Sequence, residues 1–345
     1  MLAAVTRLRE RQASNPSDFL WRQTPPLLKR SRAALAGYLH CRAADLLLIP
    51  NVTHAINLVA ASLTLPRGSE VLTTDHEYGA MWYCWQRWAC ARGWKLRKVK
   101  LPYTTEDPAE IIAAVRQALR PATRLLFFSH VTSTTGLVIP AAQLCALARR
   151  HRILSVIDGA HAVGMVPVDL ARIGADFYGA NCHKWLMAPL GCGFLHAPPK
   201  YHGLLEPLVT SWGWVSKDWQ FNLEFHGCTD RTPQMVIPEV LAFRRRLGGE
   251  SAIRQRAQAL SDYTRDRLTA CGLKPVTPFN PQLRGALVAF ELPKNHPLAK
   301  KNWLWDRYRI ECPVTAAVGK KFLRVSTAWF NSVAEIDRLA SVLRP

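Results

Sequence analysis

The sequence predicts an α/β protein in which a large, mainly parallel sheet is covered by helices and a smaller α+β lobe follows it. Strand-length apolar runs alternate with helix-period segments through the first two thirds of the chain, as in βαβ units. These strands are apolar along their whole length, which is typical of a sheet that is buried on both faces. The chain of 345 residues, 49% of them hydrophobic, is long enough for two packed lobes and excludes disordered or fibrous proteins.

The first strand and helix are expected in DLLLIP and NVTHAINLVAASL. Pro50 ends the strand, and Asn51 or Thr53 can cap the helix. A strand in EVLTT and a helix with Trp82, Trp85 and Trp88 at three-residue spacing come next. Further strands are expected in LRKVK, RLLFFS, ILSVID, FYGAN and GCGFLH, and further helices near 107–120 and 140–151.

From about Pro233 the pattern changes to one long helix that carries many arginines, EVLAFRRRLGGESAIRQRAQALSDYTRDRL. The strand-like GALVAFELP and FLRVSTAWFN and a closing helix, VAEIDRLASVL, follow it and predict a second, α+β domain. The predicted domains are an N-terminal helix (1–20) that packs with the small domain, a large domain (21–247) and a small C-terminal domain (248–345).

The nine cysteines include no CxxC pair and no Cys/His group at zinc-finger spacing, so we predict no metal site. Their odd number, spread through apolar stretches, is typical of reduced thiols in a cytoplasmic protein. No segment approaches the roughly 18 consecutive apolar residues of a membrane span. The first 16 residues predict an amphipathic helix, and we favour this over a signal peptide or a mitochondrial presequence.

The 45 Lys and Arg residues exceed the 25 Asp and Glu residues, which gives a formal charge of +20. This excess is either a general surface property or a sign of an anionic partner. The basic residues are dispersed rather than gathered in an aromatic and basic stripe, so we favour the general property, then an acidic substrate, over nucleic acid. The most basic segments are 91–100, 243–247, 294–301 and 319–322.

Three strand ends carry groups that could take part in catalysis or bind a ligand. Asp158 ends ILSVID, Lys184 follows FYGAN, and NVTH joins a strand to a helix whose free N–H groups could hold a phosphate. Each feature alone has an ordinary explanation: a turn former, a surface lysine and a common strand–helix junction. Together they form the set that pyridoxal phosphate (PLP) requires, namely a lysine for the imine, a carboxylate for the pyridine nitrogen and amides for the phosphate.

Six segments, in their order and spacing, resemble the class V aminotransferase family, and within it the isopenicillin N epimerase-like branch. The resemblance runs from about residue 5 to the C-terminus, and IDGAHAVG and NCHKWL are its most specific parts. It implies the fold type I of PLP-dependent transferases, an amino-acid substrate and a homodimer. The six segments are NVTHAINLVAASL, TTDHEYGA, SHVTSTTGLVIP, IDGAHAVG, GANCHKWL and LRVSTAWFN.

The resemblance also implies roles for individual residues around the cofactor ring. Lys184 would form the aldimine with PLP and then move the substrate Cα proton. Asp158 would pair with the pyridinium nitrogen, and His161 would lie beside the ring near its 3′ oxygen. Ser133 would contact that oxygen, and Tyr78 would stack on the ring.

At the two ends of the cofactor, the resemblance implies that the phosphate is contacted by Val52, Thr53, Asn181 and His183. The α-carboxylate of the substrate would form a bidentate pair with Arg324, whose apolar neighbours argue against a solvated strand-edge residue.

The sequence departs from the family in three places. Family members carry an asparagine–histidine–glycine turn before the first helix, and this chain starts after that point, which leaves open a misplaced start codon or a more open site. A Gly-Thr pair of the partner subunit often reaches the phosphate, but Cys228 stands at the threonine position and Thr229 is the possible substitute. Cys312 falls on a strand rather than at the loop tip where cysteine desulfurases carry their nucleophile.

The sequence does not choose among epimerisation, β-elimination and transamination. We place epimerase or C–S lyase chemistry first and an aminotransferase next, and we disfavour a cysteine desulfurase. The alternative from another class is a non-catalytic basic relative that binds nucleic acid. The joint presence of Lys184, Asp158, His161 and Arg324 argues against it.

Overall fold

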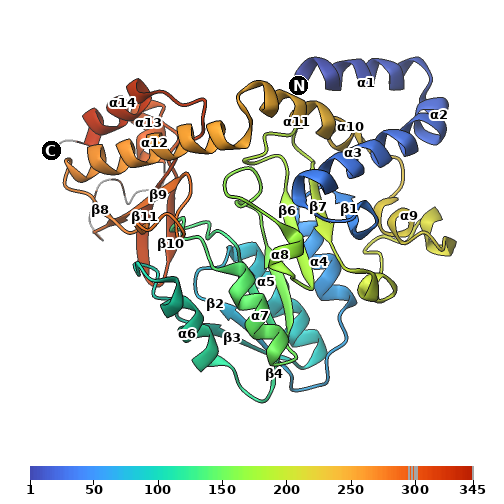
Figure 1. The fold of residues 1–345 in the computed structure, drawn as a ribbon, viewed down its shortest axis with the longest axis horizontal. Helices are drawn as coiled ribbons and strands as arrows, with labels where there is room; N and C mark the ends of the chain where they lie inside the picture. Colours follow the sequence, from blue (N-terminus) through green and yellow to red (C-terminus); the bar gives the residue numbers. More distant parts are fainter. Residues whose placement is uncertain (294–295, 297, 299–301, 344–345) are drawn as a thin grey trace.

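The structure, a computed structural model, describes residues 1–293, 296, 298 and 302–343. It contains a seven-stranded and a four-stranded sheet (Figure 1), and the predicted α/β class is confirmed. Most of the basic segment 294–301 lies outside the described residues.

The large sheet has the strand order β1-β7-β6-β5-β4-β2-β3. Strands β2 to β6 run parallel, whereas β7 is antiparallel to both of its neighbours. The strands are β1 (Leu46–Ile49), β2 (Glu70–Thr74), β3 (Lys95–Val99), β4 (Thr123–Ser129), β5 (Leu154–Asp158), β6 (Phe177–Asn181) and β7 (Gly193–His196). All of them were expected, six from apolar runs and the edge strand β3 from the largely basic LRKVK.

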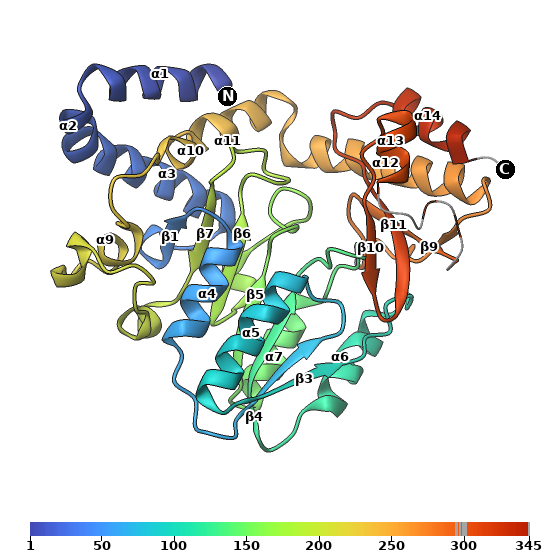
Figure 2. The ribbon, with the colours of Figure 1, turned by 180° about the vertical axis from the view of Figure 1, so that it is seen from behind.

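Helices cover both faces of this sheet. In Figure 2, α4 (Val52–Ser62) and α5 (Gly79–Arg92) lie in front of it. In Figure 1, α7 (Ala141–Arg150) and α8 (Leu170–Ile173) cover the opposite face, with α6 (Pro108–Ala118) nearby. Because successive strand side chains point to opposite faces, β1 contributes Leu47 to the core under α4 and α5 and Leu48 to the core on the other side.

The N-terminal helices pack along the β1 edge of the large sheet. They are α1 (Leu2–Ser14), α2 (Pro16–Asp18), the π-helix η1 (Phe19–Gln23), α3 (Thr24–Leu39) and the 3₁₀-helix η2 (Ala43–Asp45). We predicted packing of residues 1–20 with the small domain, but α1 contacts α10 (Thr232–Met235) and η1 instead. The reason is that its buried residues Val5 and Leu8 join the core of the large sheet.

The predicted long arginine-bearing helix is two helices, α11 (Ile237–Arg246) and α12 (Gly249–Thr269). The break lies at Gly248 and Gly249, which have φ values of 94° and 79°. An α-helix does not accommodate such positive values, whereas glycine adopts them without a steric cost. Between β7 and α10 lie η3 (Pro199–Leu204), η4 (Trp212–Val215) and α9 (Trp219–Glu224).

The small sheet is antiparallel, with the order β10-β11-β9-β8, and lies beside α12 and α14. The strands of this sheet are β8 (Lys274–Pro275), β9 (Leu287–Leu292), β10 (Val314–Ala317) and β11 (Lys320–Ser326). The helices of this part of the chain after α12 are α13 (Trp303–Tyr308) and α14 (Val333–Leu343). The boundary near residue 248 remains a prediction. Among the described helices, we find none that is both long and apolar enough to cross a membrane.

Candidate active site

The carboxyl ends of the central parallel strands meet at one edge of the large sheet. Ser129 ends β4 and pairs in register with Asp158, which ends β5, and Asn181 ends the neighbouring β6. Ligands of parallel α/β sheets bind at this edge. A cavity of 350 Å³ lies here, lined by Asn51, Val52, Thr53, Tyr78, Ser129, Val131, Ser133, Asp158, Ala160, His161, Asn181, His183, Lys184, Leu190 and Gly191. It therefore brings together nine residues that the sequence analysis selected.

Asp158 is buried at the bottom of this cavity, with 2% of its surface exposed. Its Oδ1 accepts a hydrogen bond of 2.8 Å from the N–H of Ala160. Burial raises the pKa of this carboxyl, although the Ala160 hydrogen bond and the positive charge of Lys184 act in the opposite direction. A cation or a protonated ring nitrogen beside Asp158 would restore its charged form.

His161 links the loop after β5 to Lys184. Its Nδ1 accepts a hydrogen bond of 3.1 Å from the indole N–H of Trp185, and its Nε2 lies 3.1 Å from Lys184 Nζ. Because an indole nitrogen can donate but not accept, we infer that the neutral ring carries its proton on Nε2. Nε2 then donates to Nζ, which requires an unprotonated lysine amine.

The electrostatics of the two groups agree with this arrangement. Burial lowers the pKa of Lys184, and Arg324 adds to the effect, whereas Asp158 opposes it. Burial and the nearby charges of Lys184 and Arg324 hold the pKa of His161 well below its ordinary value. Both shifts act toward the neutral forms of the two side chains, and a neutral amine is the nucleophilic form of lysine.

The N-terminus of α4 forms another wall of the cavity. Asn51 is its cap and accepts from the N–H of His54, while the N–H of Val52 donates to Asn181 Oδ1 at 2.9 Å. The main chain of Val52 is thus hydrogen-bonded to the Asn181 side chain, and Thr53 lines the cavity next to them. The Nδ1 of His183 donates to the carbonyl of Cys192 at 2.9 Å, which leaves Nε2 for a ligand.

The small sheet contributes Arg324 from β11. Its Nη1 donates to the carbonyl and to the Oγ of Ser133 at 2.7 and 3.0 Å. Its Nε is buried and has no partner among the described residues. The arginine therefore has unused donor capacity beside a cavity residue, as expected for a group that binds an anion. Tyr78, at the start of α5, lines the same cavity and is 53% exposed.

The sequence analysis missed Glu77, whose carboxyl lies beside this edge. It accepts hydrogen bonds from Ser129 Oγ at 2.6 Å and from the N–H of Ser129 at 3.2 Å. Burial raises the pKa of Glu77 to about 7, with a smaller contribution from the charge of Asp158, while the hydrogen bonds oppose the shift. The sequence signal for it was weak, because Glu77 stands between two aromatic or imidazole side chains in DHEY.

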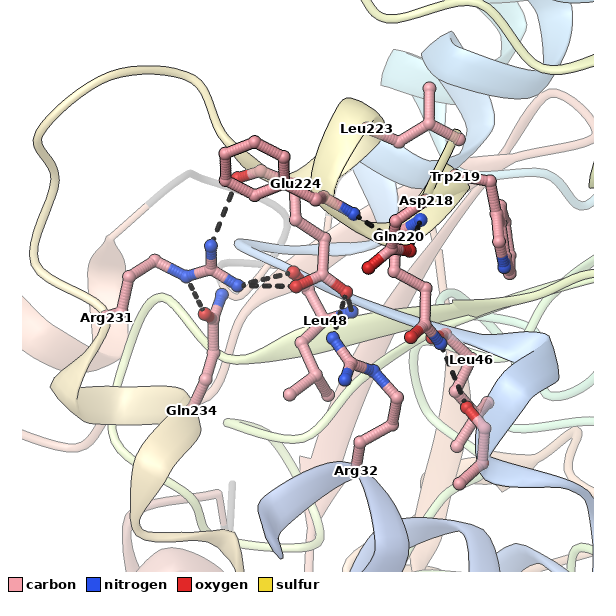
Figure 3. A network of polar contacts seen from close by, with 12 residues as sticks. Arg32, Leu46, Leu48, Asp218, Trp219, Gln220, Leu223, Glu224, Arg231 and Gln234 are labelled. Carbon is pink, nitrogen blue, oxygen red and sulfur yellow. Dashed lines mark hydrogen bonds and ion pairs between the residues drawn. The ribbon is translucent and has the colours of Figure 1, made fainter. Parts of the chain in front are cut away.

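Cys228 and Thr229 lie outside the cavity of their own chain. Cys228 is exposed, and Thr229 lines a separate 590 Å³ pocket between α3 and α9. The segment that leads to them is held by Glu224, which accepts from Arg32 at 2.8 Å and Arg231 at 3.0 Å (Figure 3). The predicted contact of Cys228 or Thr229 with the phosphate of a partner subunit therefore remains a prediction.

Comparisons with known proteins point to one family. The family model for aminotransferase class V matches residues 14–339. The isopenicillin N epimerase of Amycolatopsis lactamdurans is 43% identical, over 98% of this chain and 89% of the relative. A putative L-cysteine desulfhydrase of Oryza sativa subsp. japonica is 32% identical, over 85% of this chain and 64% of the relative.

The solved structures are similar in fold over the whole chain. The complex of the cystine C–S lyase C-DES with its reaction product cysteine persulfide matches with a TM-score of 0.86. It is 24% identical, and the match covers 100% of this chain and 94% of that one. The cysteine desulfurase CsdA of Escherichia coli matches with a TM-score of 0.81 at 20% identity, over 99% of this chain and 90% of that one.

Proposed function

The chain belongs to the class V aminotransferase family, and on this premise we propose that it is a PLP-dependent enzyme that epimerises an amino-acid derivative at Cα. The observation that carries the proposal is the meeting of Lys184, Asp158 and the Arg324–Ser133 pair at one cavity. The identity of 43% to two isopenicillin N epimerases supports epimerisation as the reaction.

The residues of the cavity fit the functional groups of PLP. Asp158 offers a buried carboxylate oxygen for the pyridine nitrogen, and Lys184 offers its amine for the aldehyde. Thr53 at the start of α4 and the Nε2 of His183 suit the phosphate. Gly193 lets β7 approach the start of α4 closely, because a Cβ there would lie 2.9 Å from the Cα of Asn51.

Each side chain has a defined task in the proposed reaction. Bound PLP supplies an electron sink that acidifies the Cα–H of an attached amino acid. Asp158 accepts a hydrogen bond from the ring nitrogen and keeps it protonated, and Arg324 binds the carboxylate of the substrate. Lys184 takes the Cα proton on Nζ, because its burial favours the unprotonated amine.

Inversion at Cα requires that a proton leaves on one side and returns from the other. Lys184 serves one side, and we propose Tyr78 for the other. Tyr78 and Ser133 line the same cavity, and Ser133 accepts hydrogen bonds from Arg324, the group that would bind the carboxylate. We propose that the Tyr78 phenol reaches Cα of the bound substrate from the side opposite Lys184.

A C–S lyase is the second candidate, and the 32% identity to a putative L-cysteine desulfhydrase favours it. Desulfurase chemistry is less well supported. Burial raises the pKa of the Cys312 thiol to about 12, which disfavours the thiolate nucleophile. Cys312 also precedes β10, whereas Val318 and Gly319 form the tip of the β10–β11 hairpin. We further propose that the enzyme is a homodimer.

The proposal is tested by incubation of the enzyme, purified with PLP, with isopenicillin N, L-amino acids and cysteine conjugates in deuterated water. Deuterium at Cα together with inversion, while the total amount of the two epimers stays constant, supports the epimerase. Pyruvate release would establish the lyase, and a requirement for a keto acid would establish the aminotransferase.

Two variants assign the protons. Lys184→Ala should remain colourless with PLP and lose both deuterium uptake and inversion. Tyr78→Phe should keep deuterium uptake with retention of configuration but lose inversion. If the wild-type protein shows no visible absorbance band that Lys184→Ala lacks, the PLP enzyme is excluded.

A further inference from the structure

One of the three arginines in the basic segment 243–247 is fully buried. Arg244 has 1% of its side chain exposed, whereas Arg245 and Arg246 point to solvent. The burial of a guanidinium requires that its N–H groups have acceptors, since an unpaired buried charge is costly. The position of these acceptors makes Arg244 relevant to the active site.

Arg244 donates to main-chain carbonyls of both loops that carry the active-site residues. Its Nη2 lies 3.0 Å from the carbonyl of Gly164, in the loop that follows Asp158 and His161. Its Nη1 lies 2.9 Å from the carbonyl of Trp185, the residue after Lys184. A single planar side chain thus joins the loop after β5 to the loop after β6.

The two loops are in direct contact at this point. Gly164 has a φ of 90°, and a Cβ on it would lie 2.5 Å from the N of Leu186 and from the carbonyl carbon of Trp185. Any displacement of the Trp185 peptide therefore changes the packing of both loops. The same residue donates its indole N–H to His161, so its position also decides which nitrogen of His161 faces Lys184.

We propose that Arg244 is a positioning residue, which fixes Trp185 and thereby the contact between the His161 ring and the Lys184 amine. The inference deepens the proposed function and rests on the role of Lys184 in it. Arg244 acts through the main chain, since its hydrogen bonds go to two carbonyls and to Glu250.

Glu250 holds the guanidinium in the required orientation. It accepts from Nε at 2.6 Å and from Nη2 at 2.7 Å, a bidentate pair, and it also accepts from the Tyr38 hydroxyl at 2.9 Å. The planar fork of arginine can meet one carboxylate and two carbonyls together, whereas the point charge of lysine cannot satisfy this geometry. A lysine at position 244 should therefore restore the function only in part.

The test compares Arg244→Met and Arg244→Lys with Arg245→Met, a matched control at an exposed arginine of the same helix. The first readout is the pH dependence with which an amine-reactive reagent labels Lys184 in the full chain prepared without PLP, with exposed Lys217 as the internal reference. The charged or titratable groups that act on Lys184 are Asp158, Arg324 and His161, with His183 adjacent, and no variant changes them. The second readout is the division of the effect between kcat and KM of the PLP-loaded enzyme.

In Arg244→Met the half-labelling pH of Lys184 should rise, because the amine loses the contact with His161 and gains water. The kcat should fall roughly tenfold to a hundredfold with little change in KM, as expected when a reacting group is misplaced. Arg244→Lys should lie between Arg244→Met and the wild type, and Arg245→Met should match the wild type.

A folded Arg244→Met protein with wild-type labelling and kcat would overturn the proposal, even if its melting temperature is lower. If Arg244→Met does not fold, Arg244→Lys decides by the same criteria. Absence of activity in the wild type would contradict the proposed function, whereas the labelling of Lys184 would still test the role of Arg244.

Discussion

Two buried clusters of arginine and glutamate stabilise different parts of the molecule in opposite ways. In the first, the buried member is the cation Arg244, which has one carboxylate partner, Glu250, and two main-chain carbonyls. In the second, the buried member is the anion Glu224, which accepts from Arg32, from Arg231 and from a main-chain N–H (Figure 3).

The difference shows which backbone each cluster can fix. A guanidinium donates in several directions and so holds carbonyls of two loops beside the cavity. A carboxylate only accepts, so Glu224 fixes the N–H of Leu48 in β1 and two converging arginines. We therefore expect changes in the first cluster to affect Lys184 and changes in the second to affect stability and the segment that leads to Cys228.

The largest effect on stability is expected for Glu224→Gln. This change leaves Arg32 and Arg231, which are 12% and 13% exposed, without a counter-charge. Removal of one partner of a buried ion pair typically costs about 3–5 kcal/mol. Urea unfolding should show a loss of this size, while the labelling of Lys184 in the folded protein stays unchanged.

Glu250→Gln is the matched comparison. The Glu250 side chain is 25% exposed, and Arg244 keeps both carbonyl acceptors, so the loss of unfolding free energy should be about 1.5–3 kcal/mol, the range for hydrogen bonds to a charged group. Equal losses in the two variants would contradict the contrast between the clusters.

Glu77 extends the comparison to a carboxyl whose hydrogen-bond partners within the described part of the chain, Thr74 and Ser129, are uncharged. Burial raises its pKa from 4.5 to about 7, so the folded state binds a proton more tightly than the unfolded state. Stability from this group is present at low pH and is lost as the pH rises between these two values. Replacement by Gln removes this titration. The unfolding free energy of Glu77→Gln, relative to that of the wild type, should therefore rise by about 2 kcal/mol between pH 5 and pH 8.

Urea unfolding of both proteins without PLP, at each pH, measures this difference. Lys184 titrates in both proteins and cancels in the comparison, whereas Asp158, whose charge contributes to the raised pKa of Glu77, adds only this smaller coupling. A difference in unfolding free energy between wild type and Glu77→Gln that stays constant across this range would show that Glu77 is ionised throughout. Glu77 would then not differ from the ion-paired Glu224 in its charge.

Local sequence signals predicted the fold, Asp158, Lys184 and the start of α4, whereas the other residues of the candidate site came from the family resemblance. The strands that end in Asp158 and Asn181 were visible as apolar runs, and parallel strands bring their carboxyl ends to one edge. The break between α11 and α12 was not predicted, because the Gly248–Gly249 pair stands within a continuous helical pattern.

The sequence could not reveal the residues that act through tertiary contacts. Arg244 stands beside two exposed arginines, and only the packing of α11 against the loops after β5 and β6 distinguishes it. Glu77 likewise depends on its contact with Ser129, 52 residues away. The packing of α1 was predicted wrongly because an amphipathic pattern indicates a buried face but not the surface that covers it.

The smallest effect is expected at the far end of the second cluster, in Cys228→Thr. If the loop after Glu224 reaches the phosphate of a partner subunit, the added hydroxyl contributes one hydrogen bond, worth about 1 kcal/mol or a fivefold slower loss of PLP at most. Cys90→Ser, at another exposed cysteine, is the control and should change nothing.

In a mixed dimer, a chain with both Cys228→Thr and Lys184→Ala should improve PLP retention at the Lys184 of its wild-type partner. PLP retention could instead improve only when Cys228→Thr and an intact Lys184 are in the same chain. This result would mean that the loop contacts the cavity of its own chain, and that Glu224 fixes a contact within one subunit rather than between subunits.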